Sequence, residues 1–440
     1  MTYLEATSLL LELPRFSTAG ATALNSGLDR MTDLLRKMGS PHRSYPTIHV
    51  AGTNGKGSTA SMVAAMCTSA GIKTGLHTSP HLLYIGERMR IDGTPSTREW
   101  LSDAVGRYKS AFRNGGVSFF EATAALSLLY FKEYLVDIAI IETGLGGRLD
   151  ATNVILPTVS VITGIARDHE DILGGSLREI AAEKAGIIKP GVPVVVGPVE
   201  TAAASIISEI ADQVGAPLTV VDKTEYVDRS GIIRSVDGPQ LDLDLPGEHQ
   251  VTNAVVATRA FECAFADRIC DMRANVSDGL TRVRSYSGLR ARLEVLCEHP
   301  NIVIDVSHNA DAIQRSIRSV ATRYDTSIVL LLALFRDKNV SDLAGVLAFL
   351  RETGALQATV LTFSVTSPRA YSARDLALDL ERHGVSARPS QLRLAEHLDD
   401  AVRDFDEDQT ILVTGSHLLA SEALTWKLDH DNQSNIHTRE

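Results

Sequence analysis

The chain has 440 residues, with 43 lysines and arginines against 54 aspartates and glutamates, so its formal net charge is −11. Hydrophobic residues make up 44% of the chain and charged residues 22%, which excludes global disorder and allows a large core in each of two or three domains. No block of lysines or arginines is present, so we expect no nucleic-acid partner, no membrane binding, and a local pocket for any anionic substrate.

The cysteines and the apolar runs indicate a reduced cytoplasmic protein. Cys67, Cys263, Cys270 and Cys297 are scattered, with no C-x-x-C pair and no zinc-type spacing to histidines. The N-terminal residues lack a basic start followed by an apolar signal core, and runs such as 328–334 are too short to cross a bilayer. We therefore expect a protein that is neither secreted nor inserted in a membrane.

Short runs rich in Val and Ile alternate with segments of helical period, a pattern that predicts α/β domains built on parallel sheets. The first part of the chain predicts strands at 47–51, 138–142, 158–163, 192–196 and 218–221, and helices at 58–70, 121–134, 202–214 and 273–284. Residues 285–288 break the pattern, so we expect domains at 1–287 and 288–440. The second domain predicts strands at 302–306, 328–333, 359–363 and 410–414, helices at 310–323 and 340–351, two further helices, and a frayed tail over 429–440.

The most specific local motif is V-A-G-T-N-G-K-G-S at 50–58, which follows a strand and opens a helix. Glycines let backbone N–H groups turn toward phosphate oxygens, and the helix N-terminus adds positive potential. Lys56 can then reach the β- and γ-phosphates, and Ser58 can ligate magnesium. The usual P-loop pattern is broken by Val50 and Gly57, yet phosphate binding is favoured over an incidental turn.

Two motifs follow at the ends of strands. T-S-P-H-L at 78–82 ends a strand that we expect to neighbour the first, so Ser79 and His81 would face the nucleotide, whereas Arg88 and Arg90 predict a solvated face. The strand 138–142 ends in Glu142 and runs into T-G-L-G-G-R-L-D-A-T-N at 143–153. An acid at the tip of an apolar strand is where a nucleotide enzyme holds magnesium or orients water, so Glu142 is the first metal candidate.

Two later residues have plain interpretations when taken alone. His169, within R-D-H-E at 167–170, is typical of a hydrogen-bonded surface histidine. Lys184, within E-K-A-G-I at 183–187, is typical of a helix-end lysine favoured by the helix dipole.

Taken in order, these segments resemble the folylpolyglutamate synthase and dihydrofolate synthase family, within the Mur ligase superfamily of ATP-dependent amide-forming enzymes. The resemblance covers nearly the whole chain. Besides the motifs already quoted, it includes F-E at 120–121, D-H at 168–169, P-G-E-H-Q-V-T-N-A at 246–254, D-V-S-H-N at 305–309, D-K-N at 337–339 and T-G-S at 414–416. The family usually has D-G-A-H-N and D-K-D, so Val306, Ser307 and Asn339 are departures.

The resemblance implies a P-loop Mur-ligase-type ATPase domain with a pterin or folate site, followed by a smaller Rossmann-like glutamate ligase domain. It places Ser58, Ser79, Glu142 and His169 on the ligands of two magnesium ions and implies that Lys184 is carbamylated. Lys56, Lys184, Asp305 and His308 would be catalytic, with His308 or Asp305 accepting the proton of the glutamate amine. Contacts to ATP would come from Thr53, Asn54, Gly55, Lys56, Gly57, Ser58, Thr59, Asn253, Arg292 and Asp305. Phe120 and Asp150 would shape the pterin site, and His308 and Ser416 the glutamate site.

The implied reaction is ATP-driven: a pteroate or folate carboxylate attacks the γ-phosphate, and L-glutamate displaces the resulting acyl phosphate. The family expectation is a monomer, with addition of the first glutamate, extension of folates, or both left open. A peptidoglycan Mur ligase is a close alternative, although about fifty residues before the phosphate-loop motif are few for a UDP-binding domain. A nucleotide-binding switch that hydrolyses ATP without ligation is a second alternative.

Overall fold

The computed structural model describes residues 1–14, 28–221, 233–234, 240–266, 269, 271–324, 326–352, 359–404 and 409–437. The chain divides into two compact units, one of Met1–Asp244 with His249–Leu289 and one of Leu245–Glu248 with Arg290–Glu440. The expected boundary before Gly288 lies close to Arg290, where the second unit resumes. Within the described ranges no helix is long and apolar enough to cross a membrane.

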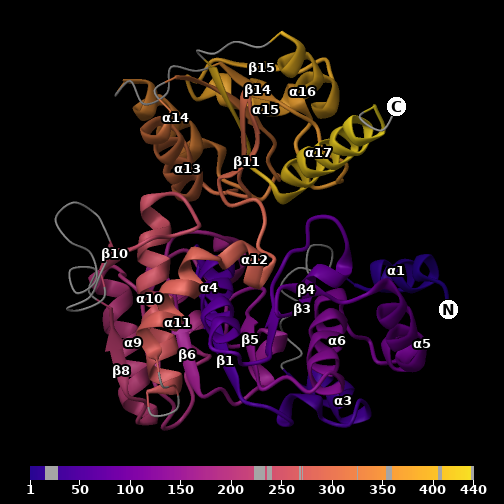
Figure 1. Ribbon diagram of the computed structural model, residues 1–440. Coiled ribbons are helices and arrows are strands. Elements are labelled where there is room, and N and C mark those ends of the chain that lie inside the picture. Colours follow the sequence, from indigo (N-terminus) through magenta and orange to yellow (C-terminus); the bar gives the residue numbers. More distant parts are fainter. Residues whose placement is uncertain are drawn as a thin grey trace. The chain divides into compact units, whose positions relative to one another are not determined.

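The described part of the first unit contains an eight-stranded sheet in the order β4-β3-β2-β5-β1-β6-β7-β8 (Figure 1). The strands β2, β5, β1, β6, β7 and β8 pair in parallel, whereas β3 pairs antiparallel with both β2 and β4. The bounds are β1 Thr47–Ala51, β2 Thr74–His77, β3 Met89–Ile91, β4 Thr94–Pro95, β5 Ile138–Glu142, β6 Val159–Ile162, β7 Val194–Val196 and β8 Leu218–Val220. β5 separates β1 from β2, so the expectation that these two strands are neighbours is wrong.

The helices of the first unit lie on both faces of this sheet. One face is covered by α4, which packs against β1, β2 and β5 and also against α11 and α12. On the other face, helices α1, α3, α5 and α6 share a core with Ala139 and Ile141 of β5. The bounds are α1 Tyr3–Glu12, α3 Asp29–Lys37, η2 Pro41–Arg43, α4 Lys56–Ser69, η3 Ile85–Arg88, α5 Arg98–Asn114, α6 Phe119–Glu133, η4 Ala151–Val154, α7 Glu170–Leu173, α8 Leu177–Ala185, α9 Thr201–Val214, α10 Glu248–Phe265, α11 Met272–Thr281 and α12 Val283–Ser287, with a ribbon of β9 Ile233–Arg234 and β10 Gln240–Leu241.

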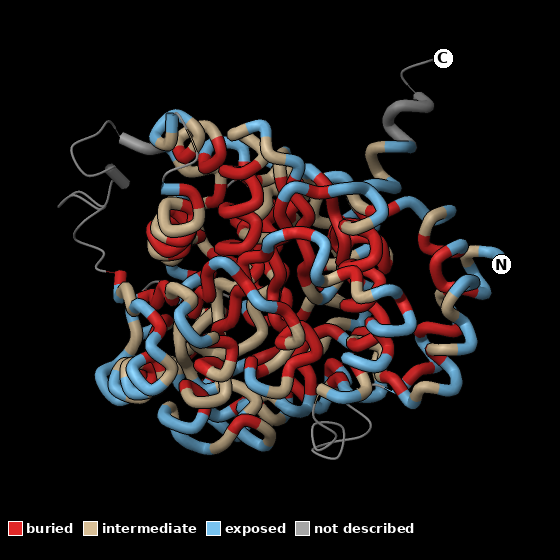
Figure 2. Tube along the Cα trace, turned by 90° about the horizontal axis from the view of Figure 1, so that it is seen from below, coloured by how far each residue is buried: buried red, intermediate tan, exposed pale blue. Residues whose placement is uncertain are grey.

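Local sequence explains where these elements begin and end. The residues of β1 and β5 are all buried, as expected of parallel strands covered on both faces, and the predicted strands 47–51 and 138–142 are confirmed. Helix α6 begins with a capping box in which Ser118 and Glu121 bond each other's backbone N–H groups. The predicted helix 273–284 is two helices, because Arg282 (φ −130°) leaves the helical conformation between them. In Figure 2 the buried parts of the chain lie toward the interior, and exposed turns and helices surround them.

The second unit contains, in its described part, a six-stranded sheet in the order β11-β12-β16-β13-β14-β15, parallel except for β11. Asn309 caps α13 by accepting the Ala312 N–H, and the predicted helix 310–323 is confirmed. The expected frayed tail is wrong as far as residue 437, because α17 continues to there. The bounds are β11 Glu294–Glu298, β12 Asn301–Ile304, α13 Ala310–Arg323, β13 Ser327–Leu332, α14 Val340–Glu352, β14 Val360–Thr362, α15 Ala373–Arg382, β15 Ala387–Pro389, α16 Leu394–Arg403, β16 Gln409–Thr414 and α17 His417–His437.

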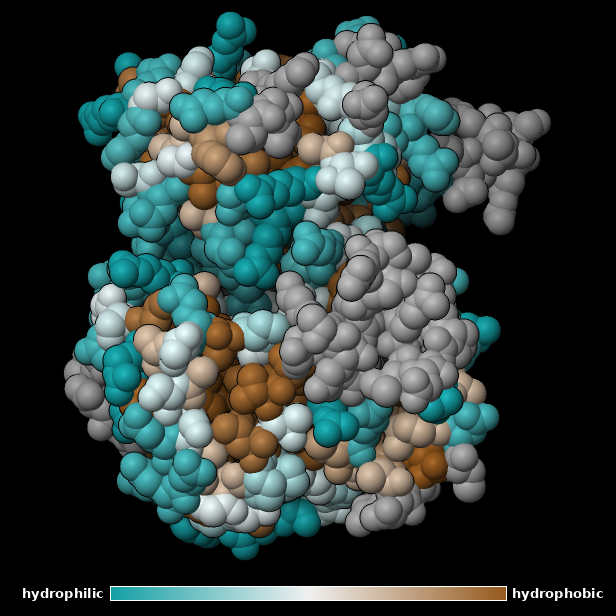
Figure 3. Space-filling view, turned by 90° about the vertical axis from the view of Figure 1, so that its left-hand side faces the viewer, coloured by the Kyte–Doolittle hydropathy of each residue, from teal (hydrophilic) through white to brown (hydrophobic). Residues whose placement is uncertain are grey.

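The face shown in Figure 3 is largely hydrophilic, with apolar side chains gathered in smaller groups. Residues 438–440 of the expected tail and Cys270 lie outside the described residues, whereas Cys67, Cys263 and Cys297 are free thiols.

Candidate active site

The turn between β1 and α4 has the backbone of an anion-binding loop. Gly55 stands before the helix in the left-handed region (φ 85°), and no side chain caps the helix start. The first-turn N–H groups of α4, where Lys56, Gly57 and Ser58 lie, are therefore left for an external acceptor such as a phosphate oxygen. Lys56 curls back so that its Nζ donates to the carbonyl oxygens of Gly52 (3.0 Å) and Thr53 (3.1 Å).

Two segments distant in sequence hold this loop in place. Thr163, at the tip of β6, donates through its hydroxyl to the Asn54 carbonyl (2.7 Å), and the Thr53 N–H donates to the Gly164 carbonyl (2.8 Å). From α10, the amide of Asn253 occupies the space that a Cβ on Gly55 would need. The structure thus places Asn253 beside the loop. Thr163 was missed by the sequence reasoning, although a threonine at the end of an apolar strand was a usable signal.

Lys184 lies beside the same loop rather than at a solvated helix end. Lys184 is only 3% exposed, and its Nζ donates to the Gly52 carbonyl oxygen at 2.9 Å. That oxygen also accepts from Lys56. Burial, reinforced by the charge of Lys56, lowers the pKa of Lys184 to about 7, while Asp168, Asp150 and Glu183 act in the opposite direction. A substantial fraction of the Lys184 amine is therefore neutral at pH 7.

Because its pKa is lowered on folding, Lys184 reduces the free energy of unfolding at neutral pH. This gives a first prediction. Below pH 7 the buried ammonium carries the full penalty, and the penalty shrinks as the pH rises from 7 toward 10.5, where the unfolded lysine also loses its proton. With Lys184 kept as the free amine in CO₂-free buffer, we expect Lys184→Met to raise the melting temperature at pH 7 and to raise it less at pH 10. Scanning calorimetry of both proteins at the two pH values measures this, and a lower melting temperature of the variant at pH 7 would contradict the buried-charge account.

Glu142 is held at the tip of β5 by the segment that follows β2. The residue is 3% exposed, and its Oε2 accepts the Ser79 N–H at 2.9 Å. Because side chains alternate along a strand, Glu142 points to the α4 face, opposite Ala139 and Ile141 of the other core. Ser58, 2% exposed, lies in the first turn of α4. The structure therefore places Glu142 and Ser58 on one side of the sheet at the carboxyl ends of its strands.

The glycine turn after β5 is folded around Asp150. One carboxylate oxygen of Asp150 accepts the N–H groups of Gly144 and Leu145 (both 2.9 Å), and the other accepts the N–H (2.9 Å) and hydroxyl (2.6 Å) of Thr152. Burial raises the pKa of Asp150, and these hydrogen bonds lower it. The ring of Phe120 packs directly on Gly144, where a Cβ would overlap it. Asp150 and Phe120 thus define the two sides of this turn.

Two fully buried histidines lie on strands beside this turn, and one of them, His49, bonds it directly. His49 on β1 and His77 on β2 are both in register with Ile141 of β5. His49 Nε2 contacts the Thr152 hydroxyl (2.8 Å), whose proton already goes to Asp150, so His49 must be the donor. In the same way His77 Nδ1 donates to the Ser127 hydroxyl (2.8 Å), which donates to a backbone carbonyl. Within the described residues the second ring nitrogen of each histidine has no partner.

These histidines predict acid lability. Burial lowers the pKa of His49 and of His77 to about 3, so both are neutral in the folded protein. The stabilisation that comes from keeping these histidines neutral is complete above pH 6.5. As the pH falls from 6.5 toward 3 the free energy of unfolding decreases, by about 2 kcal/mol per histidine at pH 5. We expect His49→Gln, which keeps a donor toward Thr152 but does not titrate, to reduce the loss of unfolding free energy between pH 7 and pH 5 in urea titrations. The exposed His383→Gln serves as control, and an unchanged pH dependence in His49→Gln would contradict the assignment.

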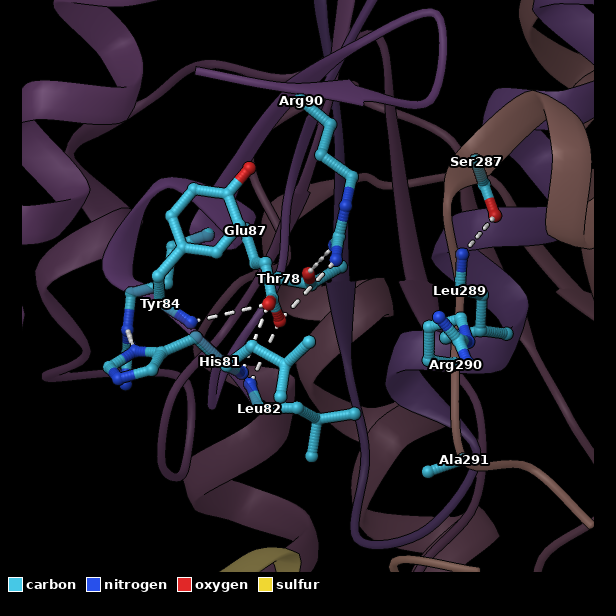
Figure 4. Close-up of polar contacts among 12 residues, drawn as sticks. Thr78, His81, Leu82, Tyr84, Glu87, Arg90, Ser287, Leu289, Arg290 and Ala291 are labelled. Carbon is cyan, nitrogen blue, oxygen red and sulfur yellow. Dashed lines mark hydrogen bonds and ion pairs between the residues drawn. The ribbon is translucent and has the colours of Figure 1, made fainter. Parts of the chain in front are cut away.

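Arg88 and Arg90 are buried, so the expectation of a solvated face is wrong. They are 7% and 8% exposed. Arg90 donates to the Thr78 hydroxyl (3.3 Å) and lies 3.7 Å from Glu87, whose carboxylate also accepts the N–H groups of Leu82 (2.9 Å) and Tyr84 (3.2 Å), as Figure 4 shows. Arg88 Nε donates to His81 Nδ1 at 2.9 Å. This network fixes the loop that carries Ser79 and His81, and Glu87 is a further residue that the sequence reasoning missed.

His169 lies after β6, in the left-handed region (φ 53°) at the start of the short helix α7. Its backbone N–H donates to Asp168 Oδ1 at 3.0 Å. Over the described ranges no three His, Cys, Asp or Glu side chains gather at metal-binding distances. The predicted metal set contains only two residues of these types, Glu142 and His169, and its other two members are the hydroxyls of Ser58 and Ser79.

In the second unit the predicted residues follow two neighbouring strands at the same sheet edge. Asp305 and His308 follow β12, and Ser416 follows β16. Asp305 is 3% exposed and His308 Nδ1 contacts the Val306 carbonyl at 3.0 Å. Ser416 is fully buried, and its hydroxyl caps α17 by accepting the Leu419 N–H at 3.1 Å. Arg292 precedes β11, where its guanidinium donates to the Ala291 carbonyl at 3.2 Å.

Comparison with known families matches both units. Residues 50–261 match the Mur ligase middle domain, and residues 291–417 match the glutamate ligase domain of Mur ligases. The folylpolyglutamate synthase of Lacticaseibacillus casei is 32% identical over 96% of this chain and 97% of its own length. The chain belongs to the folylpolyglutamate and dihydrofolate synthase family of Mur ligases. It is an ATP-dependent ligase of this family.

Other members of the family extend the match. The dihydrofolate synthase/folylpolyglutamate synthase of Mycobacterium tuberculosis is 36% identical over 87% of this chain and 82% of its own length. The structure of the M. tuberculosis folylpolyglutamate synthase complexed with ADP superimposes with a TM-score of 0.81 at 31% identity, covering 97% of this chain and 98% of that one.

Proposed function

We propose that this ligase joins L-glutamate both to dihydropteroate and to reduced folates, through an acyl-phosphate intermediate. The observation that carries this proposal is the buried Lys184 amine on the same carbonyl oxygen as Lys56, inside an anion-binding turn. The Lys56 ammonium and the N–H groups at the start of α4 suit a site that gathers and neutralises negative charge. Among the relatives, the Bacillus subtilis protein is named dihydrofolate synthase/folylpolyglutamate synthase, and one solved folylpolyglutamate synthase holds AMPPCP and folate.

In the proposed reaction an oxygen of the pterin-linked carboxylate attacks the γ-phosphorus of ATP, and the bond from that phosphorus to the β-bridging oxygen breaks. The N–H groups at the start of α4 and the Lys56 ammonium hold the phosphate chain and stabilise the charge on the transferring group. The amine of glutamate then attacks the acyl carbon, and inorganic phosphate leaves. One proton is lost from the amine, and we assign its acceptance to His308 or Asp305.

The residues present suit magnesium. The carboxylate of Glu142 and the hydroxyls of Ser58 and Ser79 are hard oxygen donors of the kind Mg²⁺ prefers, and the Glu142 carboxylate is oriented by the Ser79 N–H. We propose that these side chains and His169 hold two magnesium ions, which supply charge neutralisation at the phosphates. Thr53, Asn54, Gly57 and Thr59 complete the proposed ATP contacts with Asn253 and, from the second unit, Arg292.

We further propose that Lys184 is carbamylated. Its neutral amine, favoured by a pKa of about 7, attacks the carbon of CO₂, a nitrogen–carbon bond forms, and one proton leaves. The result is an anionic oxygen donor beside the loop, which removes the repulsion between Lys184 and Lys56. The remaining expectations stand as proposals: Phe120 and Asp150 at the pterin, His308 and Ser416 at glutamate, a monomer, a cytoplasmic location, and the division of labour between domains 1–287 and 288–440.

Mass analysis of reaction products tests the substrate range. The protein is incubated with ATP, magnesium and glutamate, and with dihydropteroate or a reduced folate in separate reactions. We expect a product carrying one added glutamate from each acceptor. Addition to one acceptor alone would refute bifunctionality but retain ligation. Phosphate release that needs neither acceptor nor glutamate, with no glutamylated product, would favour the nucleotide switch and overturn the proposal.

A further inference from the structure

The end of helix α8 packs backbone against backbone on the glycine turn that follows β5. The Arg148 N–H donates to the Glu183 carbonyl at 2.7 Å. A Cβ on Gly147 would lie 2.8 Å from the carbonyl oxygens of Glu183 and Lys184. A Cβ on Gly186 would lie 2.5 Å from the Cα of Arg148. Neither glycine has a left-handed φ, so it is the close approach of the two segments that requires them.

The side chain of Asn153 joins the same two segments. Its Nδ2 donates to the Arg148 carbonyl in the turn and to the Gly186 carbonyl at the end of α8, both at 3.0 Å. Carbonyl oxygens only accept, so the N–H₂ side of the amide must face them. Asn153 is 6% exposed, and within the described residues its Oδ1 has no partner. Both donors of the amide are therefore committed to the junction between the turn and α8.

This junction determines where the Lys184 amine lies. Lys184 is in the last turn of α8, two residues before Gly186, and its Nζ donates to the Gly52 carbonyl at 2.9 Å. Loss of the Asn153 amide would leave two buried carbonyl oxygens without these donors, which is costly and favours a shift of the helix end. A shift of about 1 Å would take the Lys184 amine beyond hydrogen-bond range of Gly52.

We infer that Asn153 is a positioning residue for Lys184: its amide fastens the end of α8 to the glycine turn and so holds the Lys184 Nζ at the phosphate loop. The effect on ligation rests on the proposed function of Lys184, whereas the placement of the amine can be measured without turnover. Two variants disturb the junction in different ways. Asn153→Ala removes both donors, and Gly186→Ala keeps the amide but forces the segments apart. The φ of −61° at Gly186 allows alanine, so only the Cβ is in the way.

Chemical labelling tests the placement directly. The protein in CO₂-free buffer is treated with a small amine-acylating reagent, and modification of Lys184 is followed by mass analysis of peptides. We expect Asn153→Ala and Gly186→Ala each to speed labelling of Lys184 by about tenfold, while the exposed Lys73 reacts at an unchanged rate. Thiol labelling of the fully buried Cys67 reports global unfolding and should also stay unchanged. Unchanged labelling of Lys184 in both variants, or a parallel rise at Cys67, would overturn the inference.

A double-mutant cycle shows whether this placement serves ligation. Initial rates of glutamate addition at saturating ATP are measured for Asn153→Ala, Lys184→Ala and the double variant. We expect Asn153→Ala to be slower than the unmodified chain by about tenfold, and the double variant to be no slower than Lys184→Ala. A double variant about tenfold slower than Lys184→Ala would show that Asn153 acts independently of Lys184, which contradicts the inference.

Two control variants leave the junction intact. Arg148→Ala removes only an exposed side chain that pairs with Glu183, and Gly175→Ala, just before the other end of α8, adds a Cβ with nothing within 4 Å. We expect both to keep the original labelling and ligation rates. Faster labelling of Lys184 in these controls would assign the effect to α8 in general and overturn the inference. Near-normal ligation by Lys184→Ala would refute the proposed function of Lys184, and the labelling rates would still decide its placement.

Discussion

Lys184→Ala should lose ligase activity by about 100- to 1,000-fold while the protein still folds. The buried amine sits on the Gly52 carbonyl beside Lys56, so whatever its modification state it lies at the phosphate loop. Its removal deletes the proposed carbamate and leaves Lys56 without the neighbouring group that would balance it. The measurement is the initial rate of glutamate addition with saturating ATP, and the fold is checked by circular dichroism and melting temperature.

Lys189→Ala is the matched control for this prediction. Lys189 is half-buried, its Nζ donates to the Asn153 carbonyl at 3.0 Å, and it follows the same helix α8. We expect it to retain most of the activity. A short-chain carboxylic acid added to Lys184→Ala should restore part of the rate, because it can supply the missing anionic oxygen. Near-normal activity of Lys184→Ala without any added acid would refute the proposed role.

Gly55→Ala should weaken nucleotide binding by roughly 10- to 100-fold. Gly55 has φ 85°, and a Cβ there would overlap the amide of Asn253. The side chain would therefore strain the backbone and push α10 away from the loop, which disturbs the N–H groups at the start of α4. Calorimetric titration with ADP and magnesium measures the loss.

A second glycine separates the effect of backbone strain at Gly55 from the effect of Cβ overlap with Asn253. Gly71 is also left-handed (φ 74°), but a Cβ there meets nothing within 4 Å. We expect Gly71→Ala to lower the unfolding free energy by about 1 kcal/mol and to leave nucleotide affinity unchanged. Equal nucleotide affinities of the two variants would contradict the view that Asn253 and Gly55 together shape the loop.

The strands that carry the site could be predicted because their burial is visible in the sequence. β1 and β5 are short apolar runs that end where glycines and polar residues begin, and both are buried along their whole length. Helix α13 could be predicted from an amphipathic repeat behind a capping asparagine. The order of the strands could not be predicted, because pairing β5 between β1 and β2 is decided by tertiary packing and not by local pattern.

The environment of charged side chains was the least predictable part of the site. Arg90 and Arg88 are buried because Glu87 and His81 lie beside them after folding, which no local periodicity encodes. Lys184 follows the helical pattern of a solvated helix end, and its burial comes from the turn at 143–153 packing on α8, where the Arg148 N–H donates to the Glu183 carbonyl at 2.7 Å. The family motif identified the residue, but the structure supplies the cause of its lowered pKa.

The central claim is that the acceptor's carboxylate is phosphorylated by ATP before glutamate is added. The direct measurement uses an acceptor whose carboxylate carries a heavy oxygen isotope, incubated with ATP, magnesium and glutamate. We predict that the inorganic phosphate released carries one labelled oxygen for each glutamylated product formed, because that oxygen bridges carbon and phosphorus in the intermediate and leaves with the phosphate. Unlabelled phosphate accompanying glutamylated product would contradict the account.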